Sequence, residues 1–408
     1  MRDVENDGNV LLKAARIAAG YGTQEALADA VGVAVRQVRR WESANPPWPR
    51  DAVQRALTSL FGQSMEDLGF TPPDGIPAQR DGQPRELPRT RGMVAVPVPG
   101  VTLQPATAGE DFAEVTRRHR RLYWTVAPAT LHPAIVAHTT LGCALLPETA
   151  GVTRRTVAAA LAESFLLAGR IEFFDSQQPE AAKETWTRAL QAAGQANDQL
   201  LGAAILAHAA FIPGWVGDRQ AAVERMRAAR TYARRGPASA ALLAWLDAVE
   251  AECETRCGHT QTALSLLGHA EDILAAGSEH PSPEWLDWFS PVRLAAFKGH
   301  TQLTAGHLPQ ARETLLGVLD GLEPSEDKQR TVILGDLAAV EAADRHPEKA
   351  CEYAVAALDQ LRRTWYSTGM DRVRDVRRAL TPWQHEQCVR GLDDRLYRWE
   401  TTVSALAR

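Results

Sequence analysis

Several features are scarce or missing in this sequence of 408 residues. Five residues are cysteine, an odd number, and they lie mostly in apolar helical patterns: Cys143, Cys253, Cys257, Cys351 and Cys388. This usage is typical of free thiols in a reducing compartment and not of a disulfide framework. No apolar run reaches eighteen residues, and the first ten residues lack the apolar core of a signal peptide. We therefore expect a cytoplasmic protein without a membrane span.

Motifs of catalysis are also missing. The sequence has no glycine-rich phosphate loop, no H-E-x-x-H and no G-x-S-x-G. Cys253, Cys257 and His259 lie close together in the chain, but a structural zinc site needs four ligands and no second pair is visible. The sequence thus predicts a protein that is not an enzyme and that holds no metal or other cofactor.

A surplus of positive charge is missing as well. The net charge of −5 excludes a protein that coats nucleic acid by bulk charge, so any such contact must be local. Aromatic residues make up only 6% of the chain, and alanine-rich stretches favour closely packed helices. A chain of this length is too long for one compact core, so several domains or a repeat array are expected.

Three regions follow one another along the chain. Residues 1–70 show short segments of helical periodicity separated by glycine and proline, which predicts a bundle of short helices. Residues 71–108 hold eight of the twenty-four prolines and predict an extended linker. Residues 109–408 are helical throughout. The predicted fold class is therefore all-α.

The third region repeats. A tight turn and an alanine-anchored second helix recur, and alignment of the anchors gives spacings of 41, 41, 48 and 39 residues: Ala181, Ala222, Ala263, Ala311 and Ala350. Helical hairpins of this kind bury their faces by stacking into a solenoid similar to tetratricopeptide repeats. The predicted repeats are about 153–195, 197–235, 237–275, 288–322 and 326–365, with capping helices in 367–404.

The segment "TQEALADAVGVAVRQVRRWES", residues 23–43, contains two amphipathic patterns around Gly32. Thr23 is a good N-cap for the first helix, and Gly32 permits a sharp turn. In the second helix Val38 and Trp41 fall on the buried side, so the neighbouring arginines face outward. The window 34–50 has four arginines and one acid, which concentrates positive charge at a helix that fits a DNA groove.

This segment resembles, without gaps, the Cro/CI-type (Xre-family) helix-turn-helix of bacterial and phage repressors. The matching features are Thr23-Gln24, Leu27-Ala28, Val31-Gly32, Val38 and Trp41-Glu42. The resemblance implies a phosphate contact by Gln24, base-edge contacts by Val35, Arg36 and Arg40, and supporting contacts by Gln37 and Arg39. One departure is Ala34, which stands where the family has a serine or threonine cap.

The later segments "EWLDWFSPVRLAAFKGHTQLTAGHLPQARETL" and "PEKACEYAVAALDQL" resemble the tetratricopeptide-like half of actinobacterial regulators with the same layout. The resemblance implies a transcription regulator that senses a peptide, a small molecule or a protein partner. Because one reading helix makes too few base contacts for tight binding, we expect a homodimer on a palindromic DNA operator. Residues on the first helices of repeats line the concave side of such solenoids. On this basis the predicted ligand residues are His208, Trp215, Arg293, Lys298 and Asp336.

Alternatives remain at several positions. The whole protein is alternatively a protein-interaction adaptor whose helix-turn-helix domain does not bind DNA. The run "RRHRR" at 117–121 predicts a solvated helix face in preference to a second phosphate-binding surface. Trp285, Trp288 and Phe289 predict core packing in preference to a ligand groove.

Overall fold

The computed structural model describes residues 8–19, 21–61, 63, 65, 68–71 and 104–406. The chain divides into two compact units, Met1–Val98 and Pro99–Arg408. Most of the predicted linker lies outside the described residues, and the last residues predicted for it begin helix α5 (Thr107–Leu122). Every regular element among the described residues is a helix, which confirms the predicted all-α class.

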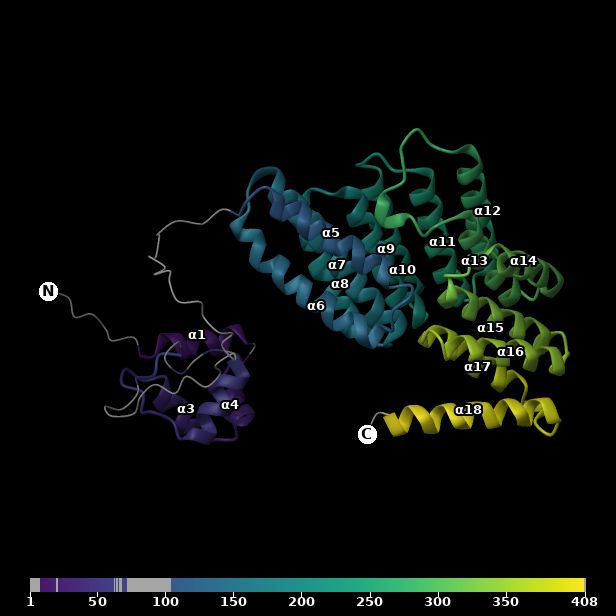
Figure 1. The fold of residues 1–408 in the computed structure, drawn as a ribbon. Helices are drawn as coiled ribbons and strands as arrows, with labels where there is room; N and C mark the ends of the chain where they lie inside the picture. Colours follow the sequence, from purple (N-terminus) through teal and green to yellow (C-terminus); the bar gives the residue numbers. More distant parts are fainter. Residues whose placement is uncertain are drawn as a thin grey trace, which may run out of the picture. The chain divides into compact units, whose positions relative to one another are not determined.

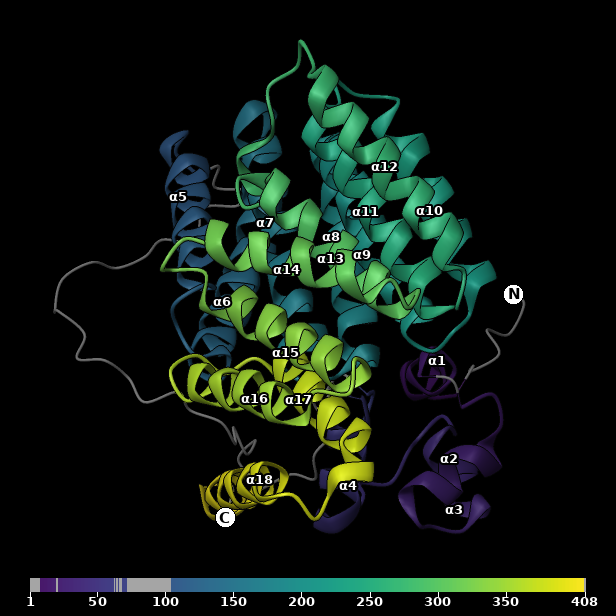
Figure 2. The same cartoon turned by 90° about the vertical axis from the view of Figure 1, so that its right-hand side faces the viewer.

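The first unit contains four helices in its described part: α1 (Val10–Ala18), α2 (Gln24–Val31), α3 (Val35–Trp41) and α4 (Asp51–Phe61) (Figure 2). Their apolar sides enclose one core, whose least exposed members are Leu12, Leu27, Ala28, Val38, Trp41, Leu57 and Leu68. Helices this short are marginal in isolation, so they depend on this shared core.

The second unit begins with α5 and α6 (Pro128–Leu145), which pack against the first hairpin (Figure 1). Five helical hairpins follow: α7 (Gly151–Arg170) with α8 (Pro179–Ala196), α9 (Gln199–Trp215) with α10 (Arg219–Ala233), α11 (Ala240–Arg256) with α12 (Thr260–Ala276), α13 (Pro291–Thr304) with α14 (Leu308–Gly321), and α15 (Asp327–Ala343) with α16 (Pro347–Leu361). Helices α17 (Ser367–Ala379) and α18 (Gln387–Leu406) follow the last hairpin. This stack is the predicted solenoid of tetratricopeptide-like hairpins.

The second helix of each hairpin buries the same three positions. The fourth, eighth and eleventh residues of α8, α10, α12, α14 and α16 are at most 2% exposed: Ala182, Trp186, Ala189, Ala222, Met226, Ala229, Ala263, Leu267, Ala270, Ala311, Leu315, Val318, Ala350, Ala354 and Ala357. Such spacing places them on one helical face. In α8 the anchor is Ala182 and not the predicted Ala181, so the first repeat spacing is one residue shorter than predicted.

The stack of hairpins closes on itself. Helix α7 continues into a short π-helix, η2 (Ile171–Asp175), which lies between the two helices of the first hairpin. The Phe174 carbonyl oxygen accepts hydrogen bonds from Ser367 Oγ at 2.5 Å and Thr368 Oγ1 at 3.2 Å, both at the start of α17. Asp175 pairs with Lys328 of α15. The first hairpin is therefore bonded directly to the last hairpin and to the helix that follows it.

One segment of the described chain, Pro128–Glu148, is long and apolar enough to cross a membrane by length and composition, and 33% of it is buried. It is not an unbroken apolar run, since it contains His132 and His138. His138 is buried and lies 2.9 Å from Thr116 Oγ1, while His132 pairs with Glu172 at 3.0 Å. The segment is thus joined to α5 and η2 through polar side chains.

Candidate functional site

A hairpin of α2 and α3 presents the basic segment. Thr23 Oγ1 caps α2 by accepting a hydrogen bond from the backbone N–H of Ala26 at 3.2 Å. Gly32 ends α2 with a φ of 73°, in the left-handed region that favours glycine. Val38 and Trp41 are 0% and 1% exposed. Helix α3 is therefore fixed to the core through the side opposite its arginines.

The arginines of α3 lie on its outer side. Arg36, Arg39 and Arg40 are exposed, and Gln37 is half-buried. Arg39 lies 3.7 Å from Glu25 of α2, with both side chains more than half exposed. Exposed pairs of this kind contribute at most about 1 kcal/mol, so the arginine can exchange this partner for a phosphate at little cost. The geometry leaves the predicted face open to a ligand.

Two predicted contact residues also have structural roles. Val35 is half-buried and packs against the core of the first unit. Gln24 Nε2 donates to Glu42 Oε2 at 2.6 Å, and the buried Arg16 donates from Nε to Glu42 Oε1 at 2.6 Å. The Gln24 amide thus joins the start of α2 to the end of α3. Ala34 gives α3 no side-chain cap, in line with the departure seen in the sequence.

The second unit contains a cavity of about 150 Å³. Its walls come from the first helices of four hairpins, α9, α11, α13 and α15, and from the ends of α7 and η2. Tyr123 and Trp124 after α5, Trp288 in the loop before α13, and residues at the start of α17 complete it. Cavities of this volume hold about one aromatic ring.

Four of the five predicted ligand residues line this cavity: His208, Trp215, Arg293 and Asp336. Lys298 lies outside it, and its Nζ pairs with Glu271 of α12 at 2.8 Å. The reason is helical spacing, because Arg293 and the residues three, four and seven positions after it share the face of α13 that lines the cavity. Lys298, five positions after Arg293, points to another side.

Aromatic rings form much of the wall. Trp288 lies between Trp124 and Trp245, with ring centroids 6.3 and 6.2 Å away. Trp288 packs against the hydrophobic core, as predicted, and it also lines the cavity. Its neighbours Trp285 and Phe289 pack against the hydrophobic core, as predicted. Phe211 and Trp215 on α9 meet edge to face at 5.3 Å on another part of the wall.

Four of the five cations at the cavity wall have a carboxylate partner of their own. On α11, Arg256 donates to Glu252 at 2.8 Å. Arg372 lies 3.1 Å from Asp336, and Arg293 lies 2.8 Å from Glu326. Lys328 pairs with Asp175. Burial raises the pKa of Asp336, but the charges of Arg372 and His300 outweigh it and hold that pKa below its usual value.

Arg170, at the end of α7, is the fifth cation. Its guanidinium carbon lies 4.9, 5.7 and 5.0 Å from the ring centroids of Tyr123, Trp124 and Trp288. Within the part of the chain that the structure describes, no carboxylate lies within ion-pair distance of it, and its buried Nε has no hydrogen-bond acceptor. The charge of Arg170 helps to lower the pKa of Asp175, but that carboxylate is in direct contact with Lys328. Among the described residues, Arg170 is thus the one wall cation without a carboxylate in direct contact.

His208 is a neutral member of the wall. Its Nδ1 donates to the Ala204 carbonyl oxygen at 2.8 Å, and its ring lies 5.0 Å from that of Trp245. Burial, together with the charge of Arg170, lowers the pKa of His208 to about 3. The imidazole therefore carries no charge near neutral pH and adds polarity without adding to the positive charge of the cavity.

Sequence reasoning missed several cavity residues, namely Tyr123, Trp124, Arg170 and Lys328. Tyr123 and Trp124 directly follow the "RRHRR" run. In that run Arg117 and Arg118 pair with Glu114 on the outer side, whereas Arg120, whose side chain is 13% exposed, pairs with Glu163 of α7 at 2.9 Å. The predicted solvated face is therefore present only in part. For Arg170 the sequence does contain a signal, because this arginine ends the apolar stretch "FLLAG". A cation at such a position needs either a partner or a ligand.

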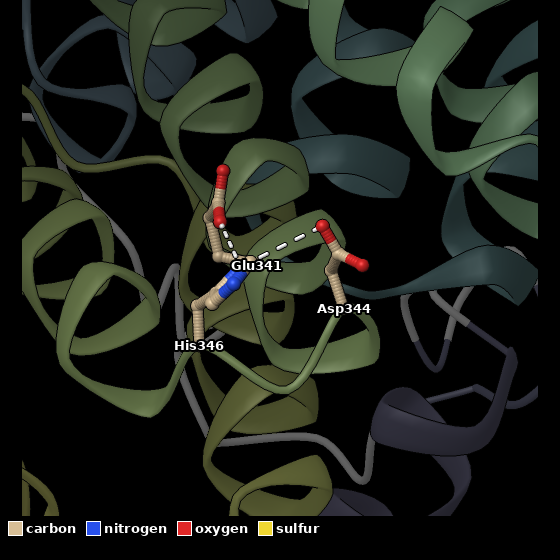
Figure 3. Close-up of side chains that lie close together, drawn as sticks. All are labelled: Glu341, Asp344 and His346. Atoms are coloured by element: carbon tan, nitrogen blue, oxygen red, sulfur yellow. Dashed lines mark hydrogen bonds and ion pairs between the residues drawn. The ribbon is translucent and has the colours of Figure 1, made fainter.

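The described residues include one cluster with the spacing of metal ligands, which is formed by Glu341, Asp344 and His346 at the turn between α15 and α16 (Figure 3). Arg312 donates to Glu341 at 2.7 Å and also to Asp344. One arginine of α14 therefore already binds both carboxylates of this cluster. Cys253, suggested above as one of three neighbours, is a buried free thiol whose pKa is raised by burial.

Comparison with known proteins gives little beyond the fold. No protein-family model matches the chain, and no curated protein matches it. Among solved structures, it is similar to a Rap protein crystallised in complex with competence and sporulation factor. The two chains are 12% identical, with a TM-score of 0.40, over 74% of this chain and 99% of the other. Function is therefore inferred from the residues of this chain.

Proposed function

We propose that this chain is a sequence-specific DNA-binding transcription regulator whose helical-repeat unit dimerises and receives an effector. The observation that carries the proposal is the exposure of Arg36 and Arg40 on α3, which Val38 and Trp41 fix to the core. Arginine reads guanine through paired hydrogen bonds to O6 and N7 in the major groove. A firmly held helix keeps these side chains in a constant register with the bases.

One such hairpin makes few base contacts, so tight binding requires two copies. We propose a homodimer on a palindromic operator with half-sites about 34–36 Å apart, one turn of DNA. The cavity of the second unit would receive a small molecule, a short peptide or a segment of a protein partner. Effector binding would change the dimer and hence the spacing of the two reading helices. The protein would act in the cytoplasm, by binding and not by catalysis.

The test is selection of genomic DNA fragments with the full chain, followed by titration of the selected site in fluorescence anisotropy. Arg36→Ala should weaken binding by about 1–3 kcal/mol and relax the sequence preference. Arg55→Ala is the control, because Arg55 is also an exposed arginine of the first unit but lies on α4. The proposal fails if no sequence is enriched, or if both variants bind the selected site as tightly as the wild type.

A second candidate is a protein-interaction adaptor with a helix-turn-helix that does not bind DNA. The engagement of the Gln24 amide by Glu42 favours it, because this side chain is then not free to reach a phosphate. The salt dependence of DNA binding separates the two candidates. A regulator that contacts several phosphates loses affinity steeply as salt rises. An adaptor shows no specific DNA binding at any salt concentration.

A further inference from the structure

We propose that the cavity of the second unit is a receptor for an aromatic carboxylate, with Arg170 as the residue that pairs with the carboxylate group. This inference deepens the proposed function by naming the chemical class of the effector. It rests on that function only in treating the ligand as an effector of DNA binding. The binding itself depends on the second unit alone. Three properties of the cavity support it: its unpaired cation, its aromatic wall and its volume.

The first property is charge. Each of the other four wall cations has a carboxylate partner, whereas Arg170 has none among the described residues. The two carboxylates of the wall, Glu252 and Asp336, are already bound by Arg256 and Arg372. The wall therefore offers an incoming anion a counter-charge and offers an incoming cation none. A buried donor without an acceptor is costly, and a ligand oxygen would satisfy the Arg170 Nε.

The second property is the surroundings of that cation. Tyr123, Trp124 and Trp288 lie around the Arg170 guanidinium and restrict it to the cavity wall. A guanidinium held in this way is preorganised for the two parallel hydrogen bonds that a carboxylate accepts. Because the guanidinium lies half-buried among these rings, the ion pair formed with a ligand would be stronger than one on the surface.

The third property is room for an apolar group beside the charge. Trp215, Trp245 and Phe211 supply ring faces and edges, and a volume of about 150 Å³ matches one aromatic ring. Aromatic pairs of this kind prefer edge-to-face or offset contacts over a small range of distances, which favours a planar ring over a branched chain. The ligand class is therefore a single aromatic ring carrying a carboxylate. It is either a free small acid or the C-terminal aromatic residue of a peptide.

The first experiment is calorimetric titration of the full chain, without DNA, with phenylacetate and with its neutral counterpart phenylacetamide. Phenylacetate should bind at least about tenfold more tightly than the amide, as expected for a hydrogen bond to a charged group. Arg170→Gln should remove most of this preference, while Lys298→Ala, outside the cavity, should keep it. The comparison of the two ligands on the wild type requires no variant, so it stands even if Arg170→Gln does not fold.

A second arm separates the two sources of the ligand. A tetrapeptide that ends in phenylalanine with a free carboxylate is compared with the same peptide carrying a C-terminal amide. Tighter binding of the free-acid peptide than of phenylacetate identifies a peptide C-terminus as the ligand, and the reverse identifies a small acid. Arg170→Lys, which keeps the charge but loses the forked donors, should bind either ligand more weakly than the wild type.

The inference is overturned if neither acid binds at millimolar concentration, if the amides bind as tightly as the acids, or if folded Arg170→Gln retains the preference. These results leave the proposed DNA binding intact, because that is measured separately through Arg36. Conversely, a chain that binds phenylacetate but no specific DNA would contradict the proposed regulator and support the proposed receptor.

Discussion

The ammonium group of Lys328 lies 2.9 Å from a carboxylate oxygen of Asp175, and both side chains are at most 2% exposed. The two residues are 153 positions apart. Burial lowers the pKa of Lys328 and raises that of Asp175, and the ion pair opposes both shifts. The Tyr123 ring lies 3.6 Å from the same ammonium nitrogen. This pair joins the first and last hairpins in a water-poor environment.

Lys328→Met should destabilise the second unit by about 3–5 kcal/mol, because it leaves the Asp175 carboxylate buried without its partner. The double variant Lys328→Met with Asp175→Leu should cost clearly less than the two single changes added together. Urea unfolding followed by tryptophan fluorescence measures both. Lys298→Met, which breaks the partly exposed pair with Glu271, serves as control and should cost no more than about 1 kcal/mol. A Lys328→Met protein as stable as the control would show that this ion pair does not stabilise the contact between the first and last hairpins.

Stability should depend on the protonation of His208. Its pKa is about 3 in the folded protein, against 6.5 for a free histidine. The unfolded chain therefore binds a proton below pH 6.5 that the folded chain does not bind. The stabilising contribution is complete above pH 6.5 and is lost as the pH falls toward 3. Between pH 7.5 and 5 this loss amounts to about 2 kcal/mol.

The measurement is the free energy of unfolding of the wild type and of His208→Gln across that range. The variant should lose about 2 kcal/mol less on acidification. Burial raises the pKa of Glu163 to about 7, and this works in the opposite direction, since the folded chain then holds a proton that the unfolded chain has released. The Glu163 effect is common to both proteins and cancels in the difference. Parallel curves would contradict a neutral buried His208.

Helices pack closely around α6, so a larger side chain in place of Gly142 is expected to clash with its neighbours. A Cβ atom at this position would lie 2.5 Å from Phe112 Cζ and 2.8 Å from Leu161 Cδ1, and both of these side chains are buried. Gly142→Ala should therefore destabilise the protein by roughly 1–3 kcal/mol. Gly268→Ala on α12, where the added atom meets nothing within 4 Å, should stabilise it by about 0.5–1 kcal/mol. Differential scanning calorimetry of the two variants should shift the melting temperature in opposite directions.

Most of the helical architecture was accessible from the sequence because its signals are local. Glycine or proline marks the turn inside each hairpin, as at Gly217 and Gly258, which both adopt positive φ. The anchor of the first hairpin was misplaced by one residue because Ala181 and Ala182 are adjacent and chemically identical. Only the direction of each side chain, which depends on where α8 begins, distinguishes them.

The cavity was predictable only in part, and the reason is distance along the chain. The rule that first helices line the inner surface brought His208, Trp215, Arg293 and Asp336 to the cavity. The same rule could not separate Lys298 from the other residues of α13. It predicts which helix lines the cavity but not which face of that helix does so. Nor could any local pattern show that Lys328 meets Asp175, since that contact depends on the summed curvature of every hairpin between them.

The contacts between η2 and α15 and α17 also set a limit on evolution of this unit. An open array of hairpins can gain or lose a member, because each one touches only its neighbours. Here an inserted or deleted hairpin would move Asp175 away from Lys328 and Phe174 away from Ser367. The number of hairpins is therefore fixed by the geometry of these contacts. We expect variation in length only in exposed loop segments such as 277–282, which come before the residues of that loop that pack against the core.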